Sequence, residues 1–475
     1  MSARFEGRVI IVGAGLAGAL AACALGDMGL EVEVYERRPD PRAKGFVGGR
    51  SINLALSCRG ITALKRVGLA DRVLSTVIPM RGRMMHATSG ALTFQAYSAD
   101  PTDAINSVSR AELNLILIEA ADRHDHVSLR FDARCAGVDL AGARAEFEDE
   151  RTGASFAAGG DLILGTDGAF SAVRDALRVS DRFDYSQQYL EHGYKELTIP
   201  PAAECGVDPA AHDGFAMEPN ALHIWPRRQA MMIALPNQDR SFTCTCFWPF
   251  EGERSFAEVE SSGDVRGFFQ THYPDAMALM PTLTADFERN PTSSLVTIRC
   301  SPWEREGRVL LIGDAAHAIV PFFGQGANAA FEDVRLLCER IEAEGDLARV
   351  VVAFSRDRKE DVDAIADMAL DNFIEMRDRV ADPAFLFRKR VDQALYRIDP
   401  ARFSPRYNLV SFSNIPYTRA RDEGGRVVAY AEHVAARLRD DGAEALSDDA
   451  LTMCVRTILE AEAGKDVQIG EEAAP

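Results

Sequence analysis

The chain of 475 residues is 47% hydrophobic and 26% charged, which is ordinary for a globular protein and long enough for about two or three structural units. Its 72 acidic against 53 basic side chains leave a formal charge of −19, which disfavours binding to nucleic acid or to an anionic membrane surface. The nine cysteines show neither a CxxC pair nor a zinc-ligand spacing, so we expect free thiols in a reducing compartment and no metal site. The sequence has no apolar run of about 18 residues and no secretory leader pattern, which predicts a cytoplasmic protein without a membrane partner.

The first elements predicted along the chain form a β-α-β unit. A strand covers Arg8–Val12, a helix follows from about Leu16 to Met28, and a second strand covers Glu31–Tyr35. In the second strand Val32 and Val34 alternate with acidic residues, as expected for a strand that is buried on one face. Such a unit predicts a parallel sheet.

A glycine motif, Gly13-Ala-Gly15-Leu16-Ala17-Gly18, joins the first strand to the helix. The first glycine permits a tight turn, the second lets the backbone approach a pyrophosphate, and the third allows close packing of the helix on the strand. Glu36 ends the second strand, where a carboxylate accepts hydrogen bonds from an adenosine ribose. The motif therefore predicts dinucleotide binding, with a purely structural turn as the alternative, and it does not distinguish FAD from NAD.

Two later segments are short apolar strands that end in glycine and aspartate. The first, Leu162–Gly168, leads into the segment Gly165–Arg174, which resembles the DG motif of flavin-dependent aromatic hydroxylases, although by itself it is equally well interpreted as a turn in which Asp167 caps a helix. Arg308–Asp314 resembles the GD motif of the same family, in which the aspartate, here Asp314, binds the ribityl chain of FAD. We expect His317, three residues further on, to pack or to form a hydrogen bond rather than to act in catalysis.

A helix is predicted to begin at Gly326. The main-chain amides of Gly326, Ala327 and Asn328 are expected to face the pyrimidine edge of a flavin, because a helix N-terminus stabilises the negative charge that reduced flavin carries there. The order of the three motifs along the chain favours FAD over NAD and points to the aromatic hydroxylases.

Several segments resemble the kynurenine 3-monooxygenase family in particular. They are ERRPDPR from residue 36, GRSINLALS from 49, MRGRM from 80, HGYKEL from 192, PNALHIWP from 219, ALPN from 234 and VPFFGQG from 320. The resemblance extends from about residue 8 to about residue 420. It implies the following cofactor-binding residues: Gly13, Gly15, Leu16, Ala17, Gly18, Glu36, Arg37, Arg38, Ala55, Arg110, Asp167, Asp314, Gly326, Ala327 and Asn328.

The same resemblance implies that Arg83, Tyr97, Tyr407 and Asn372 hold the amino-acid end of kynurenine. A guanidinium group suits a carboxylate, and phenol hydroxyls add directed donors. Without the resemblance, Arg83 would be interpreted as a solvated surface residue and the tyrosines as core rings. The sequence identifies no certain catalytic acid or base, and we expect Arg83 and Tyr97 to position the substrate.

An apolar slot for the aromatic ring is implied by the same family pattern, with Leu222, Ile233, Phe247, Pro321 and Phe322 around it. One residue departs from that pattern, because Phe323 stands where some related bacterial sequences carry histidine. This departure puts in doubt any polar contact at that position.

The predicted fold class is α/β, with a Rossmann-like FAD-binding domain, an inserted β-sheet substrate domain and a helical C-terminal region, as in the aromatic hydroxylases. The inserted sheet rests on the strand-like segments Leu222–Trp225, Ala230–Leu235 and Ser241–Trp248. The C-terminal region is expected to close the substrate site and to contain an exposed acidic segment at Asp440–Asp449. The expected boundaries are 1–70, 100–180 and 290–345 for the FAD-binding domain, 71–99 and 181–289 for the substrate domain, and 346–475 for the helical region.

The activity implied by the resemblance is hydroxylation of L-kynurenine to 3-hydroxy-L-kynurenine with NADPH and O2, through a flavin C4a-hydroperoxide, in tryptophan degradation. FAD is the bound cofactor, and NADPH is a transient co-substrate because no second Rossmann motif occurs. A related hydroxylase of another aromatic acid, such as anthranilate or salicylate, is one alternative. A non-catalytic, redox-responsive flavoprotein that acts as an interaction module is another, and it would call for an extended exposed apolar patch. A homodimer is compatible with the sequence, which does not determine the oligomeric state.

Overall fold

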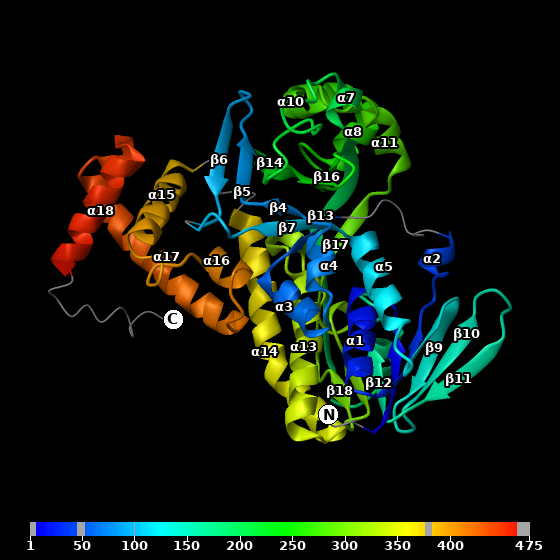
Figure 1. Ribbon diagram of the computed structural model, residues 1–475. Coiled ribbons are helices and arrows are strands. Elements are labelled where there is room, and N and C mark those ends of the chain that lie inside the picture. The colour runs from blue at the N-terminus through cyan, green and yellow to red at the C-terminus, as the bar shows by residue number, and fades with distance from the viewer. Residues whose placement is uncertain (1–5, 45–52, 99, 376–381, 463–475) are drawn as a thin grey trace.

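The structure, a computed structural model, describes residues 6–44, 53–98, 100–375 and 382–462 (Figure 1). Its centre is a six-stranded sheet in the order β18-β19-β12-β1-β2-β8. All neighbouring strands in it run parallel except β18, which is antiparallel to β19. The strands are β1 (Arg8–Val12), β2 (Glu31–Tyr35), β8 (Val127–Arg130), β12 (Leu162–Gly165), β18 (Glu304–Arg305) and β19 (Val309–Leu311).

The central strands are apolar throughout because helices or a second sheet bury them on both faces. Val9, Ile10 and Ile11 of β1 are fully buried between β12 and β2. Helices pack beside this sheet and against one another (Figure 1). They are α1 (Leu16–Asp27), α5 (Arg110–Ala121) and α13 (Gly326–Glu344), with the short α3 (Cys58–Arg66) next to α13 and α4 (Ala70–Leu74) next to α3. The β-α-β unit predicted at the N-terminus is confirmed, with α1 ending at Asp27.

Two small antiparallel sheets border the central one. The sheet β11-β10-β9 is attached through Tyr35 of β2, whose ring stacks on Phe147 of β10 at a centroid distance of 4.2 Å. The sheet β3-β7-β4 lies between the central sheet and the upper part of the molecule (Figure 1). These strands are β9 (Ala133–Asp139), β10 (Arg144–Asp149), β11 (Ser155–Gly159), β3 (Asn53–Leu56), β7 (Ile105–Ser109) and β4 (Ile78–Met80).

A seven-stranded sheet, in the order β17-β13-β16-β15-β14-β5-β6, forms the second large unit. Short helices cover its outer side (Figure 1). The strands are β5 (Gly82–His86), β6 (Leu92–Ala96), β13 (Asp184–Ile199), β14 (Ala221–Arg227), β15 (Ala230–Pro236), β16 (Phe242–Pro249) and β17 (Ser293–Ser301). The helices are α7 (Ala202–Cys205), α8 (Phe256–Ser262), α9 (Val265–His272), α10 (Pro274–Met277) and α11 (Leu283–Arg289).

The inserted sheet is predicted from the strand-like segments between residues 222 and 248. These segments correspond to β14, β15 and β16, which are adjacent in the seven-stranded sheet. Strand β17 begins three residues after the expected boundary at residue 290, and it pairs with β13 in the seven-stranded sheet. Strand β4, within the expected substrate domain, pairs instead with β7. The chain therefore crosses between the two units at both β4 and β17, and the expected domain boundaries stay a prediction.

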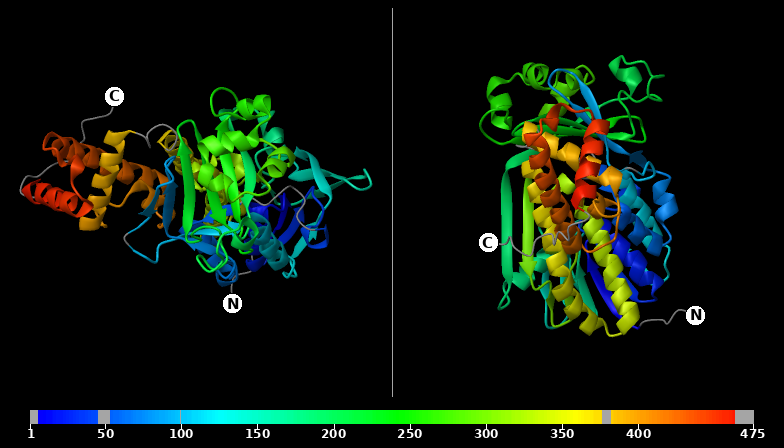
Figure 2. Two further views of the ribbon diagram at one scale, coloured as in Figure 1. Left: turned by 90° about the horizontal axis from the view of Figure 1, so that it is seen from above. Right: turned by 90° about the vertical axis from the view of Figure 1, so that its left-hand side faces the viewer.

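The C-terminal region is helical, as predicted. Its long first helix, α14 (Leu347–Ile374), packs on α13, and the later helices extend to one end of the molecule, opposite the β9–β11 sheet (Figure 2). These are α15 (Pro383–Ile398), α16 (Arg406–Ser411), α17 (Tyr417–Asp440) and α18 (Asp448–Glu462). The acidic segment from Asp440 to Asp449 is mostly exposed, as expected. No helix among the described residues combines the length and the apolar character that crossing a membrane requires.

A chain of buried polar groups lies at the β5–β14 pairing in the seven-stranded sheet. His86 Nε2 is 2.8 Å from His223 Nδ1, and His86 Nδ1 is 2.7 Å from Asp275 Oδ2. His223 Nε2 lies 2.8 Å from the main-chain oxygen of Glu218, which only accepts, so this nitrogen donates and Nδ1 accepts from His86. Burial, together with the nearby His86 and His212, lowers the pKa of His223 from 6.5 to about 4.

This environment predicts an acid-sensitive fold. Because His223 resists protonation in the folded protein, the unfolded chain binds its proton first, and stability falls as the pH decreases from about 6.5 to about 4. The contribution of this group is about 3 kcal/mol over that range. Urea unfolding at several pH values should show that His223→Gln flattens the pH dependence between 6.5 and 4. An equally steep dependence in the variant would contradict the assignment.

Candidate active site

The three glycine motifs meet at the carboxyl edge of the central sheet, because each follows a parallel strand of that sheet. Gly13 has φ +103°, and a Cβ atom on it would lie 2.8 Å from the main-chain oxygen of Thr166. A Cβ atom on Gly18 would lie 1.9 Å from the main-chain oxygen of Gly13. A Cβ atom on Gly313 would lie 3.5 Å from Cβ of Ala17. The turn after β1 therefore needs glycine at position 13 to approach the turn after β12, and glycine at position 18 to let α1 pack on Gly13. The separation between Gly313 and Ala17 is an ordinary contact, and Gly313 is favoured there by its φ of +62°.

Gly15 differs from these glycines. A Cβ atom on it would meet nothing within 4 Å, so the backbone at the start of α1 faces open space. The first main-chain N–H groups of a helix have no partner within the helix and favour an anion such as a pyrophosphate. The structure thus has the arrangement that the glycine motif predicts: two glycines that pack and one that leaves room for a ligand.

A buried arginine joins the second and third motifs. Arg174 on α6 (Ala172–Arg178) is 2% exposed and donates to the main-chain oxygens of Ala169, at 2.6 Å, and Ala315, at 2.9 Å. Ala315 lies in α12 (Asp314–His317), directly after Asp314. The carboxylate of Asp314 is exposed at the surface of this turn and can reach a ligand. Arg174 is the last residue of the segment that resembles the DG motif, but no role was predicted for it.

The two other acidic residues of the predicted cofactor site are held by backbone N–H groups. Glu36 accepts from the amides of Ala14, at 2.8 Å, and Arg38, at 2.9 Å. Asp167 Oδ2 accepts from the amides of Ala172 and Val173, the first residues of α6, but the N-cap of this helix is Ser171, so Asp167 supports the start of the helix without being its N-cap. Burial raises the pKa of Asp167, and its Oδ1 is buried without a hydrogen-bond partner among the described residues. A hydroxyl of a bound cofactor would satisfy that oxygen.

Asn328 has a structural role through its side chain. Its Nδ2 donates to the main-chain oxygens of Ala55 and Gly324, both at 2.8 Å, and its Oδ1 accepts from the amide of Ser57 at 2.9 Å. The side chain is therefore occupied in joining β3 to the start of α13. Only its main-chain N–H, with those of Gly326 and Ala327, belongs to the helix N-terminus that was predicted to face a flavin.

Arginines lie around the rim of this region. Arg37, Arg38 and Arg110 are exposed, and Arg110 begins α5. Asn114, one turn further along α5, donates to the main-chain oxygen of Ala14, which places this side of the helix beside the glycine turn. Their positive charges suit the phosphates and adenosine of a dinucleotide. Residues 49–52 of the GRSINLALS segment lie outside the described residues.

The four polar residues predicted to bind the substrate come from β5, the β6–β7 connection, α14 and α16, and three of them are in contact. Tyr97 and Tyr407 stack at a centroid distance of 5.1 Å. The guanidinium carbon of Arg83 lies 4.6 Å from the ring centroid of Tyr407 and 5.5 Å from that of Tyr97. Arg83 Nε is buried and has no hydrogen-bond partner among the described residues. This is a cationic site that a carboxylate would complete.

The electrostatics of this cluster favour an anion. Burial opposes the charge of Arg83, but the phenol oxygens of Tyr407 and Tyr97 outweigh it and raise the pKa of the guanidinium. Burial and the neighbouring Tyr407 raise the pKa of Tyr97 well above its usual value. Arg83 therefore stays charged and Tyr97 stays a neutral hydrogen-bond donor.

Apolar side chains surround the cluster. Leu222, Ile233 and Ala55 pack with Tyr97 and Tyr407, so a residue predicted for the flavin and residues predicted for the substrate share one apolar cluster. The ring of Phe322 contacts Phe247, at 5.1 Å, and Phe373, at 4.4 Å. Asn372 Nδ2 donates to the main-chain oxygen of Phe322 at 2.6 Å, which ties α14 to this wall. Pro321 is exposed, and Phe323 packs on Tyr407 at 5.5 Å rather than offering a polar group.

Comparison with known proteins agrees with this geometry. Residues 6–346 match the family described as "FAD binding domain". The chain is 46% identical to "Kynurenine 3-monooxygenase" of Myxococcus xanthus over 424 residues, which cover 89% of this chain and 90% of the relative. It is 44% identical to "Kynurenine 3-monooxygenase" of Dictyostelium discoideum over 429 residues, with 88% and 90% covered. The chain belongs to the kynurenine 3-monooxygenase family.

A solved structure supports the fold alone. The structure of 2-methyl-3-hydroxypyridine-5-carboxylic acid oxygenase superposes with a TM-score of 0.60 at 21% identity, covering 80% of this chain and 95% of that one. The predicted fold class and the predicted FAD requirement are confirmed. The individual site residues stay predictions, although the structure brings them together.

One residue near the substrate cluster was not predicted from the kynurenine 3-monooxygenase pattern. Glu375, next to the end of α14, forms an ion pair with Lys389 at 2.7 Å. Burial opposes its ionisation, but Lys389, Arg388 and Arg83 outweigh burial and lower the pKa of its carboxyl. A charged carboxylate therefore lies within electrostatic reach of Arg83. Its position three residues after Asn372, one helical turn away, is the sequence signal that could have identified it.

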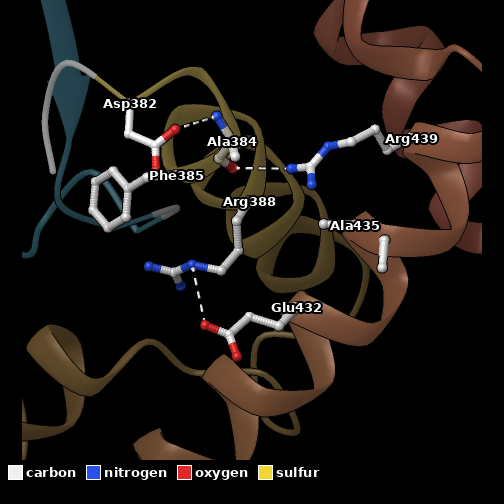
Figure 3. A pocket seen from close by; sticks show the side chains of 8 residues that line it. Asp382, Ala384, Phe385, Arg388, Glu432, Ala435 and Arg439 are labelled. Atoms are coloured by element: carbon white, nitrogen blue, oxygen red, sulfur yellow. Dashed lines mark hydrogen bonds and ion pairs between the residues drawn. The ribbon is translucent and has the colours of Figure 1, made fainter.

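Other depressions on the surface do not belong to this site. A pocket of about 290 Å³ between α15 and α17 is lined by Arg388, Glu432 and Arg439, whose charges are offset by neighbouring carboxylates or by one another (Figure 3). No residue predicted to bind flavin or substrate lines it. Within the described part of the chain, no three histidine, cysteine or acidic side chains gather in a way that could hold a metal ion.

The contrast between Gly15 and Gly18 gives a paired test of the flavin site. Gly15→Ala should leave the melting temperature of the apoprotein unchanged and weaken FAD binding by about tenfold or more, because its methyl group enters open space meant for the pyrophosphate. Gly18→Ala should instead destabilise the apoprotein by about 1–3 kcal/mol. Calorimetry and flavin fluorescence measure the two effects. If Gly15→Ala binds FAD like the wild type, Gly15 does not contact the cofactor.

Proposed function

We propose that the protein hydroxylates L-kynurenine to 3-hydroxy-L-kynurenine with bound FAD, NADPH and O2, and so acts in tryptophan degradation. The observation that carries the proposal is the buried, unpartnered Nε of Arg83 between two tyrosine rings, in a chain whose relatives are named for this reaction. When bound, FAD takes a hydride from NADPH and, once reduced, activates O2 for transfer of one oxygen atom to the aromatic ring.

The residues around Arg83 bind and orient the amino-acid end of the substrate. The guanidinium group of Arg83 pairs with the α-carboxylate and donates a hydrogen bond to it, and the Tyr97 hydroxyl donates a second one. The carboxylate of Glu375 attracts the α-ammonium group, because it carries a charge opposite to that of Arg83 and lies close by. Glu375 is already paired with Lys389, so the substrate ammonium group would share this carboxylate, whereas a simple aromatic acid would bring no positive charge to it.

The apolar residues place the ring and exclude water. Leu222 and Ile233 lie in the same cluster as Tyr97, so the ring of a substrate anchored at Arg83 extends into apolar surroundings. Phe247, Phe322 and Phe373 form a wall of contacting rings beside it. The amino group of an aniline-type ring already donates electron density to its ortho carbon, so positioning matters more than a strong base. A dry pocket also limits the loss of activated oxygen to water.

The flavin would be held by the residues at the carboxyl edge of the central sheet. Glu36 would hold the adenosine ribose, the amides near Gly15 the pyrophosphate, and Asp314 the ribityl chain. The first amides of α13 would stabilise negative charge on the pyrimidine side of the reduced ring. The preference for NADPH, the homodimer and the cytoplasmic location remain predictions.

Replacement of Arg83 tests the substrate site. Arg83→Ala should weaken L-kynurenine binding by about 100-fold, since a buried charge-assisted contact is lost, while FAD remains bound. Arg83→Lys should recover part of the affinity, because it restores a positive charge without the two-pronged geometry. Equilibrium titration of the yellow protein, followed by flavin absorbance, measures both ligands. An equal loss of flavin and substrate would make Arg83 a structural residue.

A product assay tests the reaction itself. The purified protein with NADPH, O2 and L-kynurenine should form one product that is heavier by one oxygen atom, with the hydroxyl ortho to the ring amino group. Anthranilate and salicylate serve as alternative substrates in matched reactions. A faster, stoichiometric hydroxylation of either acid would refute the proposed substrate, and flavin reduction without any product would favour the non-catalytic alternative.

A further inference from the structure

A chain of four buried ionic side chains runs between α3, α13 and α14. We call Arg59, Glu332, Arg358 and Asp333 the buried ion chain, and each is at most 4% exposed. Arg59 Nη1 lies 2.7 Å from Glu332 Oε1, and Arg358 Nη2 lies 2.8 Å from Glu332 Oε2. Arg358 Nε lies 2.9 Å from Asp333 Oδ1. One carboxylate thus bridges the two arginines, and Arg358 bridges two neighbouring carboxylates.

One end of the buried ion chain holds the loop that carries Asp314. The second oxygen of Asp333 accepts from the amide of Gly313 at 3.2 Å and lies 2.6 Å from His317 Nε2. These two residues flank Asp314, which is placed to bind the ribityl chain. Burial opposes the charge on Asp333, but His317 and Arg358 outweigh it and lower the pKa of the carboxyl. The prediction that His317 forms a hydrogen bond is confirmed, and its contact is with this carboxylate.

The other end holds the helix that carries Tyr407. Arg59 Nε donates to the main-chain oxygen of Val410 at 3.1 Å, and Nη2 donates to that of Ile415 at 2.5 Å. Val410 lies on α16, one turn after Tyr407. The guanidinium of Arg59 also lies 3.8 Å above the ring of Tyr417, whose hydroxyl donates to Gln325 Oε1 at 3.0 Å, just before α13 begins.

A direct connection between the two ligand sites follows from these contacts. Each member of the buried ion chain is compensated in part by its neighbours in the chain, and separating two neighbours is costly because a buried charge that loses a partner is strongly unfavourable. A shift of the Asp314 loop therefore acts on Asp333, Arg358, Glu332 and Arg59 in turn, and through Arg59 on the position of Tyr407. Arg358 also contacts Asp361, which accepts from the amide of Thr418 at 2.9 Å and so ties α17 to the same group.

We propose that Arg358 is a positioning residue that couples FAD binding to substrate binding. It contacts neither ligand site directly, and it keeps the Asp314 loop and the Tyr407 helix in one mutual arrangement. By thermodynamic reciprocity, L-kynurenine then tightens FAD binding by the same factor by which FAD tightens L-kynurenine binding. The choice of L-kynurenine as the coupled ligand rests on the proposed function. The contacts of Arg358 are observed independently of it.

The coupling is measured on the full-length holoprotein. Released FAD is followed by its fluorescence on dilution, with and without saturating L-kynurenine, and L-kynurenine binding is titrated separately. In the wild type, L-kynurenine should lower the Kd of FAD by about fivefold or more. We call the ratio of the two Kd values of FAD, without and with L-kynurenine, the coupling factor. In Arg358→Met the coupling factor should fall to about one, and FAD alone should bind more weakly because the Asp314 loop has lost its support.

Arg227→Met is the matched control. Arg227 is also a buried arginine, 6% exposed, but it donates to the main-chain oxygens of His86 and Pro226 in the seven-stranded sheet. Its loss should lower Tm while the coupling factor and the Kd of FAD stay at wild-type values. A purely structural role for Arg358 would make the two variants behave alike, and that result would overturn the proposal.

A milder variant keeps the proposal testable if Arg358→Met does not fold. In Arg59→Lys, the single ammonium group can pair with Glu332 but cannot also donate to both Val410 and Ile415. FAD alone should then bind nearly as in the wild type, while the coupling factor falls. Unchanged coupling in this variant would overturn the proposal. Two outcomes in the wild type separate this proposal from the proposed function. If the wild type binds L-kynurenine without any change in FAD affinity, the coupling is absent and the proposed function stands. If the wild type binds no L-kynurenine, the proposed function fails, and a comparison of FAD binding in Arg358→Met and Arg227→Met still decides whether Arg358 supports the Asp314 loop.

Discussion

The site depends on a positive charge that the fold buries beside two phenol rings. Arg83 comes from β5, Tyr97 from the connection after β6, and Tyr407 from a helix more than 300 residues later. A guanidinium group that is withdrawn from water needs an anion, and its Nε has no hydrogen-bond partner among the described residues. The arrangement is thus prepared for a ligand carboxylate, and the apolar residues around it determine where the rest of that ligand lies.

The flavin region follows a different physical rule, in which close backbone contact matters more than charge. The turns after β1 and β12 touch through Gly13, at a separation that no side chain would permit, and Gly313 in the turn after β19 has a φ of +62°. Arg174 then fixes two of these turns by binding their main-chain oxygens. Such a frame is rigid where it packs and open only where Gly15 and Asp314 face outward, which suits a cofactor that must stay in one orientation through many turnovers.

The buried ion chain lies between these two parts and joins α16 of the C-terminal region to α3 and α13. Arg59, at one end of the buried ion chain, binds the main chain of α16, the helix that carries Tyr407. The helices α3, α13 and α16 are thus joined through charges that cannot be separated cheaply in a dry interior. Cofactor and substrate sites are consequently parts of one connected structure, although the chain builds them from segments far apart.

The sequence by itself determined the elements whose signals are local. The glycine motif, the β-α-β unit and the apolar face of α13, with Phe331, Val334 and Leu337 buried, follow from spacing and could be predicted. The family pattern added the predictions of which residues bind the ligands. Only the tertiary structure decided that Glu332 and Asp333 are buried rather than solvated, that Asn328 uses its side chain to join β3 and α13, and that β17 pairs with β13. The reason is physical: periodicity reports which face of an element is apolar, whereas a buried charge is stabilised by partners that are distant in sequence and leave no local pattern.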